Sequence, residues 1–159
     1  MKEQSGVAGF MADVKARAAK SMAAGQSTTQ FILEIGDAYA FIRLQDWRTP
    51  LRFLKQMAGA PPIQFGTRGF KRSIVDDKNP ARHYTAFVFV GYWLPTPLAF
   101  IVLWAWEILG FVRYRGKWSQ PDMRCGRLGI RHGRLVRQQG PGSLTGLIER
   151  DLTEPEIKR

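Results

Sequence analysis

Cysteine and histidine are nearly absent from this sequence. Cys125 is the only cysteine among 159 residues, which excludes an intrachain disulfide and a thiolate cluster for zinc or iron–sulfur. His83 and His132 are the only two histidines, and neither has a second ligand-type residue at the spacing of a metal-binding motif. We therefore expect no metal site and no bound cofactor.

Sequence motifs of catalysis are also lacking. The chain has no glycine-rich phosphate loop, no nucleophile elbow and no Cys/His/Asp constellation at catalytic spacing. We therefore expect no catalytic residue, and we interpret the chain as a structural component rather than an enzyme.

Acidic residues are few. The chain has 24 Lys and Arg against 13 Asp and Glu, which gives a formal net charge of +11. The basic residues gather on both sides of a long apolar run. Anionic lipid head groups attract such flanking charge, and nucleic acid attracts the same residues, so composition alone does not choose between these partners.

The longest apolar run, YTAFVFVGYWLPTPLAFIVLWAWEILGFV, covers residues 84–112, and Glu107 is its only charged residue. A continuous helix of this length would measure about 43 Å, more than the roughly 30 Å hydrocarbon core of a membrane. Pro95 and Pro97 predict a kink near its middle, so we expect one bent helix over most of residues 87–112. The alternative is a buried core helix, which needs more surrounding apolar material than the rest of the chain offers.

Three short helices are predicted before this run, at residues 7–24, 27–46 and 49–59. The first is basic and amphipathic; it resembles a mitochondrial targeting peptide, and a surface helix packed on a partner is the alternative. Ser27 or Thr28 is the expected N-cap of the second helix. Residues 63–80 lose helical periodicity and predict an irregular linker.

The residues after the apolar run are basic and rich in glycine. Gly126, Gly129 and Gly133 argue against a stable helix, so a short hairpin is predicted, with RLGIR and RLVRQ joined around His132-Gly133. The end of the chain, LTGLIERDLTEPEIKR, is expected to form one short helical turn and a tail.

The predicted fold class is mainly α, with a single kinked transmembrane helix, short amphipathic N-terminal helices and an irregular basic C-terminal extension. The predicted parts are residues 1–83, the membrane helix at 84–112, and the extension at 113–159.

The candidate functional residues are charged. Glu107 is the predicted intramembrane polar residue, either a structural contact near the interface or, less favoured, a proton relay. Five basic residues are predicted to bind lipid phosphate or an acidic partner: Arg113, Arg115, Lys117, Arg124 and Arg127. The neighbouring Arg131, Arg134 and Arg137 extend the same series. These arginines could also bind RNA. However, residues 119–143 offer no aromatic side chain for stacking on bases apart from His132.

Several short motifs follow one another between residues 60 and 118: Phe65-Gly66, Gly69-Phe70-Lys71-Arg72, Asp77-Lys78-Asn79-Pro80, an apolar run that begins with aromatics, and Arg113-Tyr114-Arg115-Gly116-Lys117. Their order resembles that of subunit f of mitochondrial F-type ATP synthases. The resemblance implies one transmembrane helix beside the proton-translocating subunit, with the N-terminal part in the matrix.

The expected function is therefore that of a noncatalytic, single-span accessory subunit, a scaffold or assembly factor, in an energy-converting complex of the mitochondrial inner membrane. Its expected partners are other subunits of that complex and anionic lipid such as cardiolipin. The alternatives are an accessory subunit of a respiratory-chain complex and a membrane-tethered protein associated with RNA or ribosomes.

Overall fold

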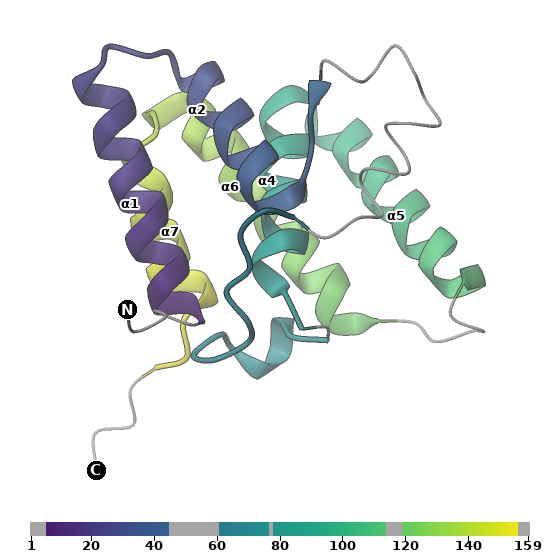
Figure 1. Cartoon of the computed structure of the whole chain (residues 1–159). Helices are drawn as coiled ribbons and strands as arrows, with labels where there is room; N and C mark the ends of the chain where they lie inside the picture. Colours follow the sequence, from purple (N-terminus) through teal and green to yellow (C-terminus); the bar gives the residue numbers. More distant parts are fainter. Residues whose placement is uncertain (1–5, 45–60, 77, 114–118, 156–159) are drawn as a thin grey trace.

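The computed structural model describes residues 6–44, 61–76, 78–113 and 119–155, without the side chains of residues 112 and 113. The described chain is mainly helical (Figure 1). Its elements are α1 (Val7–Ala23), α2 (Thr28–Ile35), the π-helical turn η1 (Gly36–Ala40), the 3-10 turn η3 (Arg72–Ile74), α4 (Pro80–Trp93), α5 (Thr96–Arg113), α6 (Gln120–Gln139) and α7 (Ser143–Leu152).

The N-terminal helices begin where the sequence pattern predicts, but the second ends at Ala40, earlier than predicted. Helix α1 covers the predicted segment, and its apolar stripe faces the core. Helix α2 begins at the predicted cap: the Ser27 hydroxyl accepts from the backbone N–H of Gln30, and the Gln30 side chain accepts from the N–H of Ser27, a reciprocal capping box. The turn η1 continues this helix to Ala40, before Phe41 adopts a left-handed conformation. The helix predicted at 49–59 lies outside the described residues.

Helices α1 and α7 lie side by side at one end of the molecule (Figure 1). The irregular segment of residues 65–71 joins them: the backbone N–H of Val7 donates to the Arg68 carbonyl at 2.8 Å, and the N–H of Lys71 donates to the Leu152 carbonyl at 2.8 Å. Because its stripe of apolar residues packs on the core, α7 is a full helix and not the single turn that was predicted.

Aromatic side chains form the centre of the core. The ring of Phe10 lies 5.3 Å from the ring of Tyr39, 5.3 Å from Phe65, 6.2 Å from Phe70 and 6.0 Å from Tyr84, measured between centroids. These residues come from α1, η1, the irregular segment and α4. One aromatic cluster therefore connects the N-terminal helix to the middle of the chain.

Glycine brings α4 and α6 into close contact. A Cβ atom on Gly133 would lie 2.1 Å from the Val88 carbonyl oxygen, and one on Gly91 would lie 2.2 Å from the Ile130 carbonyl oxygen. The hairpin predicted at residues 127–138 is wrong, because one helix, α6, covers this segment. The glycines that lower intrinsic helix propensity allow two helix backbones to approach, and this packing stabilises α6.

The apolar run is divided between two helices. Leu94 has an extended conformation, with φ −102° and ψ 145°, as expected for a residue before proline, so α4 ends at Trp93 and α5 begins at Thr96. The break falls where the prolines predicted a bend. The prediction of one continuous or kinked helix over most of residues 87–112 is wrong, because two separate helices cover this run.

The prediction of a single transmembrane helix is also wrong. Among the helices that the structure describes, none combines the length and the apolar character that crossing a membrane requires. Most of the apolar residues of α4 are buried within the protein, although Trp93 at its end is exposed. The sequence predicts too little apolar material in the rest of the chain to surround a core helix. Helices α1, α2, α6 and α7 supply the apolar residues that surround α4.

Candidate functional site

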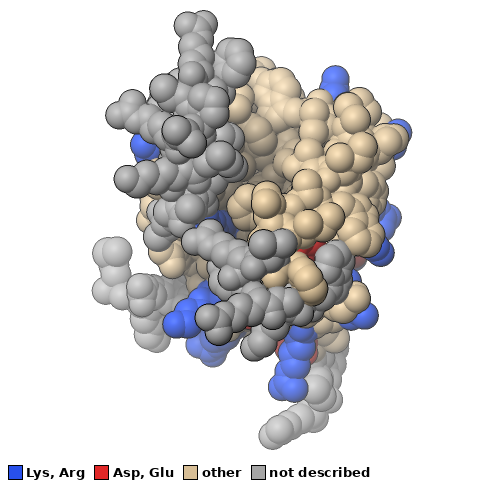
Figure 2. Space-filling model, turned by 90° about the vertical axis from the view of Figure 1, so that its right-hand side faces the viewer, with Lys and Arg blue, Asp and Glu red and all other residues tan. Residues whose placement is uncertain are grey.

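Helix α5 exposes most of its apolar side chains. Leu109 is 66% exposed, Ile101 62% and Ile108 53%. The other exposed apolar residues of α5 include two tryptophans and a phenylalanine. They are Leu98, Val102, Trp104, Trp106 and Phe111. Figure 2 views the molecule from the side of α5. A broad area of this face shows no charged side chain, and Lys and Arg lie toward its margins.

A narrow stripe holds α5 on the rest of the protein. Ala99, Leu103 and Glu107 are its buried residues, and they follow one another at intervals of four, on one face of the helix. Ala99 and Leu103 pack with Phe87 of α4 and with Met123 and Ile130 of α6. Phe100 is partly buried and packs against the same cluster, while most of the other apolar side chains of α5 are exposed.

The outer face of α6 carries a series of arginines. Arg124 and Arg127, predicted to bind lipid or a partner, are exposed there, together with Arg131, Arg134 and Arg137. Arg134 donates to the Thr96 hydroxyl at 3.3 Å, and Arg137 donates to the Tyr92 carbonyl at 3.3 Å, so both brace the break between α4 and α5. The first three arginines of the series, at 124, 127 and 131, form no hydrogen bond or ion pair with another described residue.

An open groove lies between the start of α5 and this arginine face. Its volume is about 340 Å³, and Thr96, Phe100, Arg127, Ile130, Arg131, Arg134, Leu135 and Gln138 line it. Cationic guanidinium groups and apolar side chains therefore meet in one concave surface. Such a surface suits a ligand with an anionic group and an adjoining apolar part.

The other three predicted lipid-binding residues follow in the chain at and after the end of α5. Arg113 is the last residue of α5, and its side chain lies outside the described part of the chain. Arg115 and Lys117 are also outside the described residues.

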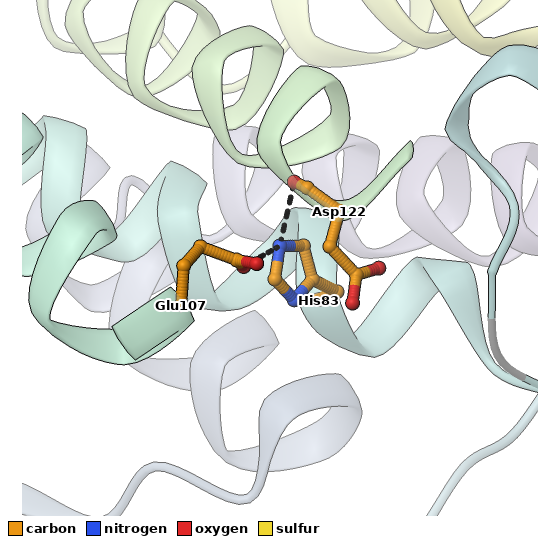
Figure 3. Close-up of side chains that lie close together, drawn as sticks. All are labelled: His83, Glu107 and Asp122. Atoms are coloured by element: carbon orange, nitrogen blue, oxygen red, sulfur yellow. Dashed lines mark hydrogen bonds and ion pairs between the residues drawn. The ribbon is translucent and has the colours of Figure 1, made fainter. Parts of the chain in front are cut away.

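A second candidate site is a polar cluster inside the molecule. His83 of α4, Glu107 of α5 and Asp122 of α6 each offer one ligand-type atom, and these atoms lie within 4.8 Å of one another. In Figure 3, Glu107 points toward the imidazole of His83, and the Asp122 side chain lies beside the same ring. Glu107, predicted to lie within a membrane, is thus buried against two other helices.

The hydrogen bonding of the cluster centres on His83. Its Nε2 atom lies 2.9 Å from the backbone carbonyl oxygen of Asp122 and 4.0 Å from Glu107 Oε1. A carbonyl only accepts, so Nε2 carries the hydrogen and donates it. The Ser119 hydroxyl accepts from the Asp122 N–H at 3.1 Å and caps α6, which fixes Asp122 beside the ring.

Electrostatics make Glu107 the most unusual member of the cluster. Its side chain is 6% exposed. Burial, together with repulsion from the Asp122 and Asp76 carboxylates, raises the pKa of Glu107 to about 7. Near neutral pH this carboxyl group is therefore poised between its charged and neutral forms.

A separate buried network stabilises the contact between α4, α6 and α7. Tyr84 Oη lies 2.7 Å from His132 Nδ1, and His132 Nε2 lies 2.9 Å from Asp151 Oδ2. The Asp151 carboxylate accepts from Nε2–H, so Nδ1 accepts from the Tyr84 hydroxyl in neutral His132. Tyr84 and His132 are both fully buried, which indicates a structural role.

The sequence prediction missed the polar cluster. The three residues lie on three helices, 24 and 15 positions apart in the sequence (107 − 83 and 122 − 107), far beyond the spacing of a local metal motif. A search for a second ligand-type residue at metal-motif spacing from each histidine does not detect neighbours that folding brings from distant positions. A helical interpretation of residues 120–139 would have been needed to place Asp122 near His83.

Comparison of the chain with protein families, with curated protein sequences and with solved structures finds no match. The resemblance to subunit f of mitochondrial ATP synthases therefore stays a prediction from the sequence.

Proposed function

We propose that this protein is a noncatalytic accessory protein that binds an anionic membrane surface, with α5 lying in the lipid interface. The observation that carries the proposal is the exposure of apolar side chains around most of α5. The noncatalytic part follows from the absence of catalytic motifs in the sequence.

The exposed face of α5 has the composition of an interfacial helix. Burying apolar surface contributes about 25 cal/mol per Å², so a helix that leaves Ile101, Ile108 and Leu109 more than half exposed gains substantially by entering lipid. Trp104 and Trp106 are also on this surface, and tryptophan favours the level of the lipid head groups. Contiguous apolar patches of this kind mark protein or membrane contacts.

The positive charge supports a lipid partner of the opposite sign. The net charge is +11, and each Lys or Arg near an anionic membrane contributes about 1 kcal/mol of attraction. The groove places Arg127 and Arg131 close to Phe100, so that a lipid phosphate and the start of its acyl chain would each meet a suitable surface. Apolar and basic surfaces that adjoin one another are the pattern of in-plane membrane binding.

RNA is the weaker candidate partner. The arginine series of α6 would attract RNA phosphate, but α6 carries no Phe, Tyr or Trp for base stacking. RNA binding also leaves the exposed surface of α5 without a partner. A membrane accounts for both features together.

The test is co-sedimentation of the full chain with vesicles of phosphatidylcholine, with and without cardiolipin. We expect binding to the cardiolipin vesicles that weakens as salt rises, with a blue shift of tryptophan fluorescence as Trp104 and Trp106 leave water. The double substitution Ile101→Glu/Leu109→Glu should abolish this binding. The double substitution Arg127→Gln/Arg131→Gln should weaken it by about 2 kcal/mol, roughly thirty-fold.

Met22→Glu is the matched control, because Met22 is 54% exposed on α1, away from the proposed surface, and should leave vesicle binding unchanged. Protein that stays in the supernatant with every vesicle would overturn the proposal. In that case, RNA binding that depends on Arg127 and Arg131 would support the RNA-associated alternative. A dimer that disperses in the Ile101→Glu/Leu109→Glu variant would instead assign the α5 face to a second copy.

A further inference from the structure

We propose that His83, Glu107 and Asp122 bind one divalent transition-metal cation of the zinc type between α4, α5 and α6. An imidazole nitrogen with two carboxylate oxygens is a ligand set that proteins use for zinc. The atoms of this set already lie within 4.8 Å of one another. The inference does not depend on the proposed binding to membranes.

Glu107 is the residue that most needs a cation. Its side chain is 6% exposed and points at His83 (Figure 3), yet the structure gives it no hydrogen bond to any described residue. The separation of 4.0 Å between Glu107 Oε1 and His83 Nε2 is beyond hydrogen-bonding range. Burial of an ionisable group without a hydrogen-bond partner is costly, and a bound cation would remove that cost.

The repulsion between carboxylates points to the same ligand. The carboxylates of Asp122 and Asp76 lie close enough to Glu107 to repel its negative charge. Such a gathering of acids is unexpected in a chain with a net charge of +11. A divalent cation would turn this repulsion into attraction.

Metal binding through Nε2 of His83 requires this nitrogen to give up one hydrogen bond. The Nε2 atom donates a hydrogen to the Asp122 carbonyl oxygen at 2.9 Å, on the same side of the ring as Glu107 (Figure 3). A metal would replace that hydrogen on Nε2, because metal-bound histidine is neutral and uses the lone pair of that nitrogen.

Binding requires a modest contraction of the cluster. Ligands about 2.0 Å from a tetrahedral zinc are roughly 3.3 Å from one another, so atoms separated by as much as 4.8 Å must draw together. Three protein ligands also leave a position open for water, as in zinc sites that are not purely structural.

A metal at this place would anchor α5. Ala99 and Leu103 hold the first half of that helix by packing, and Glu107 is the buried residue of its second half among the side chains that the structure describes. Coordination would tie this half to α4 through His83 and to α6 through Asp122.

The first experiment is isothermal titration of the untagged full chain, purified with EDTA and then dialysed, with ZnCl₂ at neutral pH. We expect one site per chain and a rise in Tm on zinc addition. Glu107→Gln and His83→Asn should each weaken binding by about 100-fold or more, the upper end of the loss seen even for outer-shell changes at metal sites. Glu149→Gln, an exposed acid on α7, is the matched control and should bind zinc as the unaltered protein does.

Substitution of Co²⁺ for Zn²⁺ keeps the test decisive if a variant fails to fold. Visible d–d absorption with nitrogen and oxygen ligands is expected from the unaltered protein. A thiolate charge-transfer band would place the metal at Cys125 and overturn the proposal. Absence of binding, or equal binding by Glu107→Gln and the unaltered protein, would overturn it as well.

Discussion

Helices α1 and α5 are almost equal in length, with 17 and 18 residues, but they meet their surroundings in opposite ways. Helix α1 is amphipathic: Val7, Phe10, Val14 and Ala18 are buried, while its lysines are exposed. Helix α5 is apolar nearly all round and buries only a narrow stripe. A helix that is apolar all round is normally enclosed by protein or by lipid. The comparison shows that α1 buries its apolar stripe within this chain, whereas α5 leaves most of its apolar side chains exposed.

The largest expected effect comes from emptying the centre of the packed region. Phe10→Ala should lower the free energy of unfolding by about 3–5 kcal/mol, the usual cost of removing a buried aromatic ring, because Phe10 contacts four other rings. Ile101→Ala on α5 should change it by less than about 0.5 kcal/mol. Urea unfolding followed by circular dichroism measures both, and equal losses would remove the distinction between the two helices.

The next largest effect compares glycine-to-alanine substitutions on α6 and on α5. Gly133→Ala should destabilise the protein by about 3 kcal/mol, at the upper end of the usual cost of overpacking, because its Cβ would meet the Val88 carbonyl oxygen. Gly110→Ala on α5 has open space around the new methyl group and should stabilise the helix by about 0.5–1 kcal/mol. The two shifts in Tm should therefore have opposite signs, and a stabilising Gly133→Ala would refute the close approach of α4 and α6.

The smallest effect concerns acid sensitivity of the packed region. Burial lowers the pKa of His132 below its ordinary value of 6.5, so the unfolded chain binds the proton more readily. Stability should therefore fall as the pH falls below about 6.5, by at most about 1.4 kcal/mol per pH unit for one proton. The pKa of Asp151, lowered to about 2, chiefly by its bond from Arg150, adds a further loss below its ordinary value of 3.8.

The measurement is Tm against pH in the Glu107→Gln background, with and without His132→Gln. This background is needed because the raised pKa of Glu107 has the opposite sign: its folded form binds the proton more readily, which favours folding as the pH falls toward 4.5. His132→Gln should flatten the fall in Tm between pH 6.5 and 5. An unchanged slope would show that His132 does not titrate differently in the folded state.

The parts of the fold that depend on local pattern could be predicted from the sequence. The periodicity of residues 7–24 predicts α1, and Ser27 predicts the start of α2, because a helical stripe and a capping hydroxyl act over a few residues. The prolines likewise locate the break after Trp93. Hydropathy, however, does not say whether apolar residues face lipid or protein, and the transmembrane prediction failed at that point.

The rest depends on contacts between distant segments. Helix α6 forms despite its low intrinsic propensity because Gly129 and Gly133 fit against α4 and Gly126 fits against Leu103 of α5. This is a tertiary effect that a local pattern does not report. The arginine series was recognised from its spacing, and the structure places it on one exposed face. The cluster of His83, Glu107 and Asp122 was not predicted, because its members meet only when α4, α5 and α6 are assembled.

The pairing of α1 with α7 has a consequence for how the chain folds during synthesis. The Thr153 hydroxyl donates to the sulfur of Met11 across a sequence separation of 142 residues, and residues 65–71 bond to both helices. The ribosome must release α7 before the first helix can complete its packing, and contacts of such long range slow folding. Helix α5 emerges earlier with its apolar surface uncovered, and such surfaces promote aggregation during folding. Early capture of α5 by a membrane or a chaperone would therefore protect the nascent chain while its two ends are still apart.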